Sequence, residues 1–312
     1  NTSIDFFNLL VTDELLELIA RETNIYAEEV FLSGATKEKS RITRWKDVTV
    51  EELRIFIGLV LHLGTIRLNR LQDYWKTHRL FNLPAFKNYM SRDRFMLIFR
   101  CLHFSKNPLP GQEKSTDSLY KIRPLIDYFN SRMSDVYYPG KELSLDESMV
   151  LWRDRLIFRQ YIKNKRHKYG VKLYLLTEPD GIVQKFAVYT GTGTIHKQEV
   201  KKPKAVVEYN NFMGGIDRKD QMMAYYPCER KTMRLYKKLG IHIIYMSLIN
   251  SFFIYKKFML ERQVLEKLLP ETEGPSIEKN QMPAKHVPKK ILKPDRGKHM
   301  HIEDAQFVTK IR

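Results

Sequence analysis

Cysteine is nearly absent from this sequence. Only Cys101 and Cys228 occur among its 312 residues. Two cysteines cannot build a framework of several disulfides, and no set of Cys and His with zinc-ligand spacing accompanies them. We therefore expect a protein of a reducing compartment that folds without disulfide cross-links.

The sequence also has no long, uninterrupted apolar run. The longest such stretch, Ile241–Ile254, is too short and too polar to cross a bilayer. Four polar residues interrupt it: His242, Ser247, Asn250 and Ser251. No signal peptide is recognisable in the residues that follow Asn1. A membrane role is therefore not expected.

Acidic residues are in deficit. The chain has 36 Asp and Glu against 54 Lys and Arg, which gives a formal net charge of +18. An excess of this size favours a polyanionic partner, such as DNA, RNA or an anionic membrane. Because no membrane segment is expected, nucleic acid is the preferred interpretation. Nothing in the composition indicates a small-molecule substrate.

The N-terminal part of the chain has the pattern of helices. Residues 1–136 are predicted to form a helical domain of a dimerisation or DNA-binding type. Thr49 and Glu52 form a capping box. Apolar residues then recur at helical spacing: Leu53, Phe56, Ile57, Val60 and Leu61. Ser91 and Ser118 are predicted to begin two further helices.

The period of the pattern changes in residues 137–269. Extended segments are predicted at three ranges: 142–151, 168–177 and 182–190. The turn sequence Glu178-Pro-Asp-Gly181 separates the last two. Together they predict a three-stranded antiparallel meander that carries Asp146 on its first strand. Helices are predicted from about 206 to 269, and then a basic, largely disordered tail over 270–312. The expected fold class is α+β or α/β.

Two acidic motifs and a series of upstream motifs carry a resemblance. Asp146 lies in Leu143-Ser-Leu-Asp-Glu-Ser-Met149, and Asp217 and Asp220 lie in the segment Tyr209–Met222. Six upstream motifs occur in the expected order: Phe6–Leu16, Glu22–Tyr26, Trp45–Leu53, Asp73–Trp75, Met90–Phe95 and Leu102–Phe104. Over residues 1–191 and 204–295 the chain resembles the piggyBac family of DNA transposases, and above all its domesticated derivatives.

The resemblance implies a ribonuclease-H-like core with DDE chemistry. In such sites carboxylates hold two divalent ions that cleave and join phosphodiesters. Mg²⁺ is the ion implied for the ancestral family. Asp146 would bridge the ions and Asp217 would bind the second one, with Asp220 beside it. Without the resemblance, Asp146 is more simply a solvated strand acid. Asp217 and Asp220 are equally well explained as a pair that suits the dipole at a helix N-terminus.

The middle acid of the family's catalytic triad does not occur here. Tyr189–His196 joins the predicted third strand almost directly to the region before Asp217. The resemblance implies that a helix, a fourth strand with its acid, an inserted domain and a fifth strand are missing. None of four candidate substitutes has the required setting at a strand end: Glu178, Asp180, Glu199 and Glu208. We therefore predict an internal deletion or splice, and expect that Mg²⁺ is not productively bound.

The missing block also predicts an incomplete sheet. The strand with Asp146 would lack a neighbour on one side, and its unpaired backbone groups would favour self-association. The apolar face of the meander is also expected to lose a covering helix. That face carries Val171, Leu173, Leu175 and Val188.

Two basic clusters are the predicted DNA-binding residues. The first follows the Asp146 strand: Lys163, Lys165, Arg166, His167 and Lys168. The second recurs at helical spacing: Arg230, Lys231, Arg234, Lys237 and Lys238. Phosphate contact is one interpretation of both. A solvated loop or a nuclear import signal explains the first equally well, and a solvated helix face is the usual explanation of the second.

No cysteine follows the segment Lys285–Ile291, which resembles the approach to the family's C-terminal zinc domain.

The sequence thus predicts a nuclear, piggyBac-transposase-derived protein that binds DNA through charge and is catalytically inactive. Whether it forms a homodimer is left open. Two alternatives stay open as well. One is a transposase that is active only in a fuller isoform, and the other is a translated relic without activity.

Overall fold

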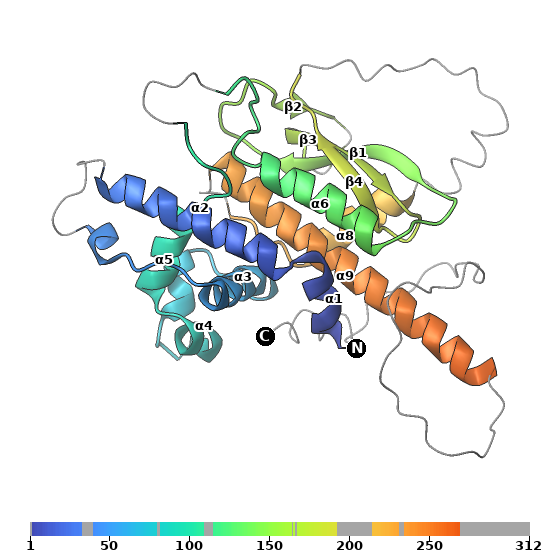
Figure 1. The fold of residues 1–312 in the computed structure, drawn as a ribbon, viewed down its shortest axis with the longest axis horizontal. Helices are drawn as coiled ribbons and strands as arrows, with labels where there is room; N and C mark the ends of the chain where they lie inside the picture. The colour runs from blue at the N-terminus through green and yellow to red at the C-terminus, as the bar shows by residue number, and fades with distance from the viewer. Residues whose placement is uncertain are drawn as a thin grey trace.

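The computed structural model describes most of the chain. Its backbone covers residues 2–32, 40–79, 82–108, 115–163, 165, 167–191, 214–230 and 234–268, with side chains up to residue 263. The predicted tail over 270–312 and the predicted junction at 192–200 lie outside these residues. In Figure 1, helices gather below a small sheet.

The N-terminal part of the chain is helical, as predicted. Its helices are α1 (Ser3–Leu10), α2 (Asp13–Leu32), α3 (Val50–Thr65), α4 (Pro84–Tyr89), α5 (Arg92–Cys101) and α6 (Arg123–Val136), with 3₁₀ turns at Arg41–Arg44 and Leu71–Trp75. The helix start predicted at Ser118 is wrong. The Asp117 carboxylate caps a turn there by accepting a hydrogen bond from the N–H of Leu119 at 2.9 Å, and α6 begins only at Arg123.

The predicted caps Thr49 and Ser91 are confirmed, but Glu52 does not complete a capping box, because its carboxylate accepts hydrogen bonds from Arg94 at 2.7 and 2.6 Å. The Thr49 hydroxyl accepts a hydrogen bond from the N–H of Glu52 at 3.2 Å at the start of α3. The Ser91 hydroxyl does the same for the N–H of Arg94, also at 3.2 Å, at the start of α5. Each satisfies a donor that the helix itself leaves unpaired, and such caps contribute about 1 kcal/mol each.

One antiparallel sheet follows. It consists of β1 (Ser144–Leu151), β2 (Gln160–Tyr161), β3 (Tyr169–Thr177) and β4 (Val183–Val188). β3 lies in the middle, with β1 on one side, and with β4 and the two-residue β2 on the other. The predicted meander is confirmed, and β2 is an addition that was not predicted. Among the described residues β1 pairs only with β3, so the Asp146 strand is an edge strand, as expected.

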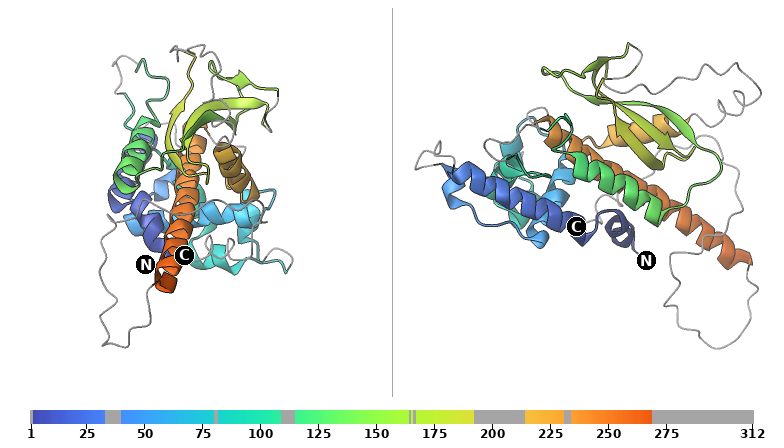
Figure 2. Two further views of the ribbon diagram at one scale, coloured as in Figure 1. Left: turned by 90° about the vertical axis from the view of Figure 1, so that its right-hand side faces the viewer. Right: turned by 45° about the horizontal axis from the view of Figure 1, so that its top comes forward.

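One face of the sheet is buried beneath helices. The residues Val171, Leu173 and Leu175 on this face are at most 1% exposed. Figure 2 shows α6, α8 (Gly214–Tyr225) and α9 (Leu235–Leu268) on this side of the sheet. The expected loss of a covering helix is therefore wrong. In the sequence, α6 comes before the meander, and α8 and α9 come after it. The helices that cover this face therefore come from distant parts of the chain, which the local pattern of the strands does not reveal.

Two asparagines complete the outer edge of β4. The amide of Asn130 in α6 bonds to both the N–H and the C=O of Phe186, each at 2.9 Å. The amide of Asn250 in α9 does the same for Val183, at 3.0 and 2.8 Å. Backbone groups at a buried sheet edge must find partners. These side chains supply them where a neighbouring strand would otherwise be needed.

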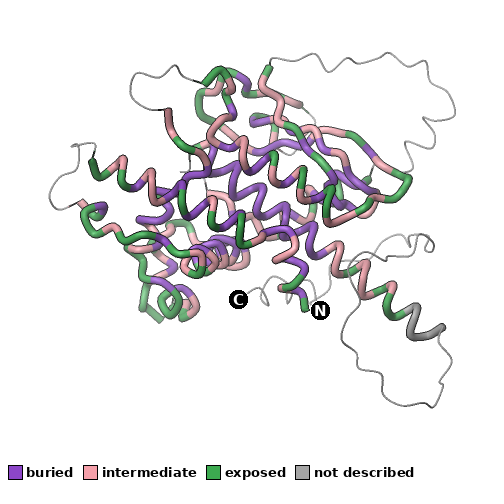
Figure 3. The backbone as a smooth tube through the Cα atoms, in the orientation of Figure 1, coloured by how far each residue is buried: buried purple, intermediate pink, exposed green. Residues whose placement is uncertain are grey.

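Helix α9 is the axis of the core. Its N-terminal half, residues 236–252, is buried throughout, and Figure 3 shows this part in purple. By length and composition alone, the segment Leu235–Gln263 could cross a membrane, but 89% of its most apolar window is buried inside the protein. That is the usual situation of a helix in a protein core.

Buried side chains of the helices and of the sheet form one continuous hydrophobic cluster, from Phe7 in α1 to Phe252 in α9. The predicted domain boundary at residues 136 and 137 falls between α6 and β1, which both contribute to this core. The division into domains stays a prediction.

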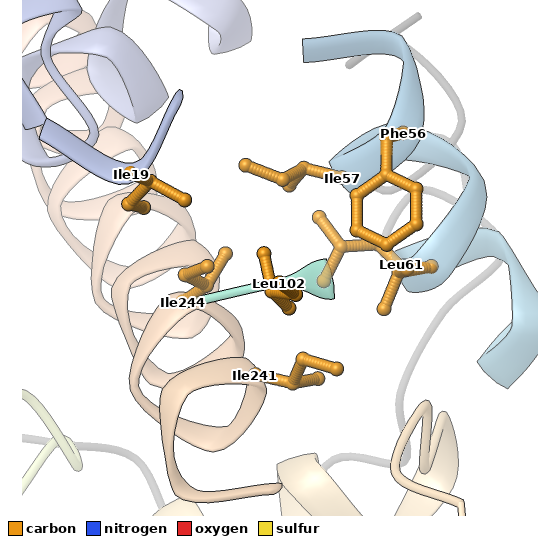
Figure 4. A pocket seen from close by; sticks show the side chains of 8 residues that line it. Ile19, Phe56, Ile57, Leu61, Leu102, Ile241 and Ile244 are labelled. Atoms are coloured by element: carbon orange, nitrogen blue, oxygen red, sulfur yellow. The ribbon is translucent and has the colours of Figure 1, made fainter. Parts of the chain in front are cut away.

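A cavity of about 10 Å³ lies within this core (Figure 4). Apolar side chains of α2, α3 and α9 line it, among them Ile19, Phe56 and Ile244. A space of this volume holds one water at most. It is a packing gap and cannot bind a substrate.

Candidate functional site around Asp146 and Asp220

Two glycines allow α8 to pack closely against the sheet. A Cβ atom on Gly215 would lie 2.1 Å from the carbonyl oxygen of Glu178, so only glycine permits this approach. Gly181 has a φ of +99°, a conformation that favours glycine. A Cβ atom on Gly181 would lie 3.3 Å from the carbonyl oxygen of Gly215. Gly215 of the acidic motif and Gly181 of the β3–β4 turn therefore allow the first turn of α8 to pack on that turn. This contact sets where Asp217 and Asp220 lie.

Helix α8 brings Asp220 to strand β1. The hydroxyl of Ser148 donates a hydrogen bond to the Asp220 carboxylate at 2.7 Å. The ammonium of Lys219 donates to the same carboxylate oxygen at 2.9 Å and lies 3.3 Å from the Ser148 hydroxyl. The Lys219 side chain is 0% exposed. A lysine is almost never buried this completely unless it is paired, so its charge is committed to this contact.

The charge on Asp220 is stabilised where it lies. Burial acts to raise the pKa of its carboxyl group. The Lys219 charge and the hydrogen bonds from Lys219 and Ser148 outweigh burial, and the pKa stays below its ordinary value. Asp220 is therefore an ionised carboxylate that already has an internal counter-ion.

Asp146 lies on the same face of β1 as Ser148, because alternate residues of a strand share a face. The two Cα atoms are thus about 7 Å apart. The Asp146 carboxylate is 34% exposed and lies 3.6 Å from the ammonium of Lys165. The structure therefore brings Asp146 and Asp220 to one neighbourhood through Ser148, and each of the two carboxylates has its own lysine.

Asp217 is placed differently. It lies in the first turn of α8 and is exposed. Its position suits the partial positive charge of a helix N-terminus. Its predicted role as a metal ligand stays a prediction.

A second charged cluster adjoins the site, and sequence reasoning missed it. The carboxylate of Glu229 lies 2.5 Å from Nδ1 of His242 and 3.5 Å from the ammonium of Lys238. Burial opposes the charge on Glu229, but the His242 and Lys238 charges and hydrogen bonds hold its pKa below the ordinary value. The only available signal was Glu229 itself, an acid that directly precedes a run of basic residues.

The second predicted basic cluster is largely internal. Lys237 and Lys238 are 5% and 7% exposed. Lys237 donates to the backbone oxygen of Phe99 at 3.0 Å, and Lys238 donates to that of Leu151 at 2.6 Å. These two lysines bond α9 to α5 and to β1. They therefore do not form the solvated helix face that their spacing suggested.

Arg230 and Arg234 complete the description of this cluster. Arg230 is half-buried and donates to the backbone oxygen of Leu68 at 2.8 Å. Arg234 is exposed, and Lys231 lies outside the described residues. Within this part of the chain, Arg234 is therefore the member of the cluster that the fold leaves on the surface. DNA contact by these residues stays a prediction.

The first basic cluster lies on the surface. Lys163 and Lys168 are exposed, Lys165 and His167 are half-buried, and Arg166 lies outside the described residues. Lys165 of this cluster lies beside β1, because its ammonium is 3.6 Å from the Asp146 carboxylate. Contact of the cluster with phosphates also stays a prediction, and its exposure is compatible with that contact.

Two of the weighed substitute acids have other contacts. Glu178 is 3% exposed and accepts hydrogen bonds from the Tyr137 hydroxyl at 2.9 Å and from Lys257 at 3.2 Å. Asp180 forms an exposed ion pair with Arg218 at 3.6 Å. Glu199 and Glu208 lie outside the described residues.

Comparison with known proteins agrees with this arrangement. The transposase IS4 family model matches residues 2–199 and 194–252, which is most of the chain. The chain belongs to the piggyBac-type family of transposases. PiggyBac transposable element-derived protein 3 of Homo sapiens is 27% identical over 200 residues, which are 64% of this chain and 31% of that protein. PiggyBac transposable element-derived protein 2 of Homo sapiens is 28% identical over 192 residues, or 61% of this chain and 29% of that protein.

The fold is that of a solved family member. A cryo-EM structure of the piggyBac transposase synaptic complex with hairpin DNA matches with a TM-score of 0.70 and 21% identity. The match covers 84% of this chain and 76% of that one. The predicted family and fold class are confirmed. The chain spans about a third of the length of the human relatives that it matches.

Transposases of the DDE type generally use divalent metal ions, but the donor set here does not fit a two-metal site. Such a site needs several carboxylates free to face the ions. Asp146 and Asp220 each have a lysine partner, and Asp217 is exposed on α8. Within the described ranges, no three His, Cys, Asp or Glu side chains come together as a group that could hold a metal ion.

Proposed function

We propose that this protein is a nuclear, piggyBac-transposase-derived DNA-binding protein that has lost strand cleavage. The single observation that carries the loss is the ion pair between the fully buried Lys219 and Asp220. The buried Lys219 ammonium neutralises the acid beside Asp217, the expected ligand of the second ion, and its positive charge disfavours a divalent ion there. With Asp146 also paired and no middle acid, the two-ion arrangement of the family chemistry has no complete set of ligands.

The match to the family model supports a missing central block. It consists of two stretches, residues 2–199 and 194–252, which meet at 194–199. The sequence places the junction at the same position.

Binding to DNA is supported by charge. A formal net charge of +18 favours a polyanion. Arg153 and Arg155 between β1 and β2, and Lys163 and Lys168 between β2 and β3, are exposed and leave part of this charge open to solvent. The solved protein of the same fold is described as a synaptic complex with hairpin DNA. We infer binding through phosphates, with little selectivity for sequence.

A second function has one observation in its favour. Asp220 bonds to Ser148, two residues from Asp146 on the same face of β1, so the two acids still lie in one neighbourhood, as an active site of this family would need. A fuller isoform that restores the missing block could then be an active transposase. In that form Lys219 and Lys165 would have to give up their carboxylates.

Two assays test the proposal. The purified chain is incubated with transposon-end DNA and Mg²⁺ or Mn²⁺, and we expect neither nicked nor joined products. Cleavage that Asp146→Asn abolishes would contradict the loss of catalysis. In parallel, binding to a duplex is measured between about 50 and 300 mM salt. We expect the affinity to fall steeply. An affinity independent of salt would contradict binding through charge.

A further inference from the structure

Two tyrosines lie opposite each other where the short strand β2 pairs with the start of β3. Tyr161 of β2 pairs directly with Tyr169 of β3. Their ring centroids are 4.8 Å apart, and the ring planes are inclined at 43°. Tyr161 is 54% exposed and Tyr169 is 50% exposed. Two adjoining aromatic rings are thus half open to solvent on a surface hairpin.

One arginine lies over this pair, and the segment of sequence around it is basic. The guanidinium of Arg159 lies over the Tyr169 ring, 5.6 Å from its centroid. Residues 153–168 contain seven Lys and Arg and one acid, Asp154. The described arginines of this segment are exposed, as are Lys163 and Lys168. Exposed aromatic faces beside a dense positive charge form the combination that binds single-stranded nucleic acid, with bases on the rings and phosphates on the cations.

The simplest alternative is a cross-strand pair that only stabilises the hairpin. The pair does occupy directly opposed positions, so it contributes to pairing. A pair that only stabilised the fold would be expected to pack its rings against the core, whereas these two rings are half exposed. An apolar protein partner is also disfavoured, because the surrounding charge is almost entirely positive.

We propose that Tyr161 and Tyr169, with Arg159 over the Tyr169 ring, form a stacking platform for unpaired nucleobases. This inference rests on the proposed DNA-binding function and specifies the form of nucleic acid bound. In a duplex the base faces are covered by their neighbours, so an intact helix offers only its phosphates. An unpaired strand offers both base faces and phosphates. Lys165 of the same hairpin contacts Asp146, so the bound strand would lie beside the acidic site.

The test compares an unpaired strand with a duplex. A labelled 12-nucleotide single strand, its RNA counterpart and a 12-base-pair duplex are titrated with the full chain, and fluorescence anisotropy gives each Kd. The double variant Tyr161→Leu/Tyr169→Leu removes the rings but keeps apolar contact between β2 and β3. The variant Tyr161→Phe/Tyr169→Phe keeps the rings. Tyr89→Leu is the matched control, because Tyr89 is 53% exposed at the end of α4.

We expect the Leu pair to weaken single-strand binding by about tenfold or more and to leave duplex binding within about twofold. The Phe pair and the Tyr89 control should keep the affinity of the parent chain. Weaker binding in the DNA arm alone would assign the platform to DNA, and weaker binding in both arms would assign it to nucleobases in general.

Three outcomes overturn the platform. They are unchanged single-strand affinity in the Leu pair, an equal fall for single strand and duplex, and a fall in the Phe pair as large as in the Leu pair. Circular dichroism and Tm of each variant show whether the hairpin still folds. Failure of the parent chain to bind any of the three nucleic acids would instead overturn the proposed DNA-binding function.

Discussion

Lysines of α8 and α9 and lysines of the β2–β3 hairpin carry the same charge in opposite environments. Lys219, Lys237 and Lys238 are at most 7% exposed, and all bind acceptors inside the protein. Lys163 and Lys168 are exposed. The first set therefore holds the fold together, and the second is free to meet a polyanion. Net charge alone overstates the cationic surface, because part of it is neutralised within the core.

The largest effect is expected for Lys219→Met. It leaves the Asp220 carboxylate without its counter-ion, and breaking such a pair costs about 3–5 kcal/mol when both groups are buried. Because Asp220 is 35% exposed, we expect a decrease of about 2–3 kcal/mol in the free energy of unfolding. Urea denaturation at pH 7 measures it.

The double variant Lys219→Met/Asp220→Asn is the control for this change. It removes the uncompensated charge, so part of the stability should return. Equal destabilisation of the single and double variants would mean that Lys219 acts through packing and not through its charge.

The second prediction concerns pH and Lys237. Burial lowers the pKa of its ammonium to about 8 from an ordinary 10.5. Between these two values the unfolded chain binds more protons than the folded one, so the contribution of Lys237 to stability rises with pH. We expect the stability difference between the parent chain and Lys237→Met to shift by a few kcal/mol, in favour of the parent, from pH 8 to pH 10.5. A difference independent of pH would mean that Lys237 stays charged in the fold.

The third prediction concerns the exposed set. The triple variant Arg155→Gln/Lys163→Gln/Lys168→Gln should change the free energy of unfolding by about 0.5 kcal/mol or less for each residue. In duplex binding, the slope of log affinity against log salt should fall by up to about 0.9 for each phosphate that the variant no longer neutralises. Lys237→Met is the matched control and should leave the slope unchanged. A slope that changes as much in Lys237→Met would remove the distinction between the two sets.

The smallest effect is expected at Asp146. Its pair with Lys165 is partly exposed on both sides, at 34% and 24%, and such pairs contribute about 1 kcal/mol or less. Asp146→Asn should therefore change Tm little, in contrast to Lys219→Met. A large decrease of stability in Asp146→Asn would show that Asp146 also has a structural role on β1.

Local patterns predicted the elements of this fold well. Capping residues gave the starts of α3 and α5, alternation gave β3, and extended segments beside it, one of them after a turn sequence, gave β1 and β4. Two-residue β2 has too few residues to show any period, and it was missed. The start of α6 was placed too early, because Asp117 caps a turn before the helix. These are differences of a few residues, and each has a local physical cause.

The sequence by itself determined the family and the order of the elements, because these depend on motifs and periodicity along the chain. Only the tertiary structure decided which charges are used internally. Lys219 and Lys238 look like any surface lysines in the sequence, and they are buried because α8 and α9 pack against β1. The tertiary structure likewise decided that Asn130 and Asn250 pair with the outer edge of β4. Contacts between residues dozens of positions apart depend on how elements pack, which no local spacing encodes.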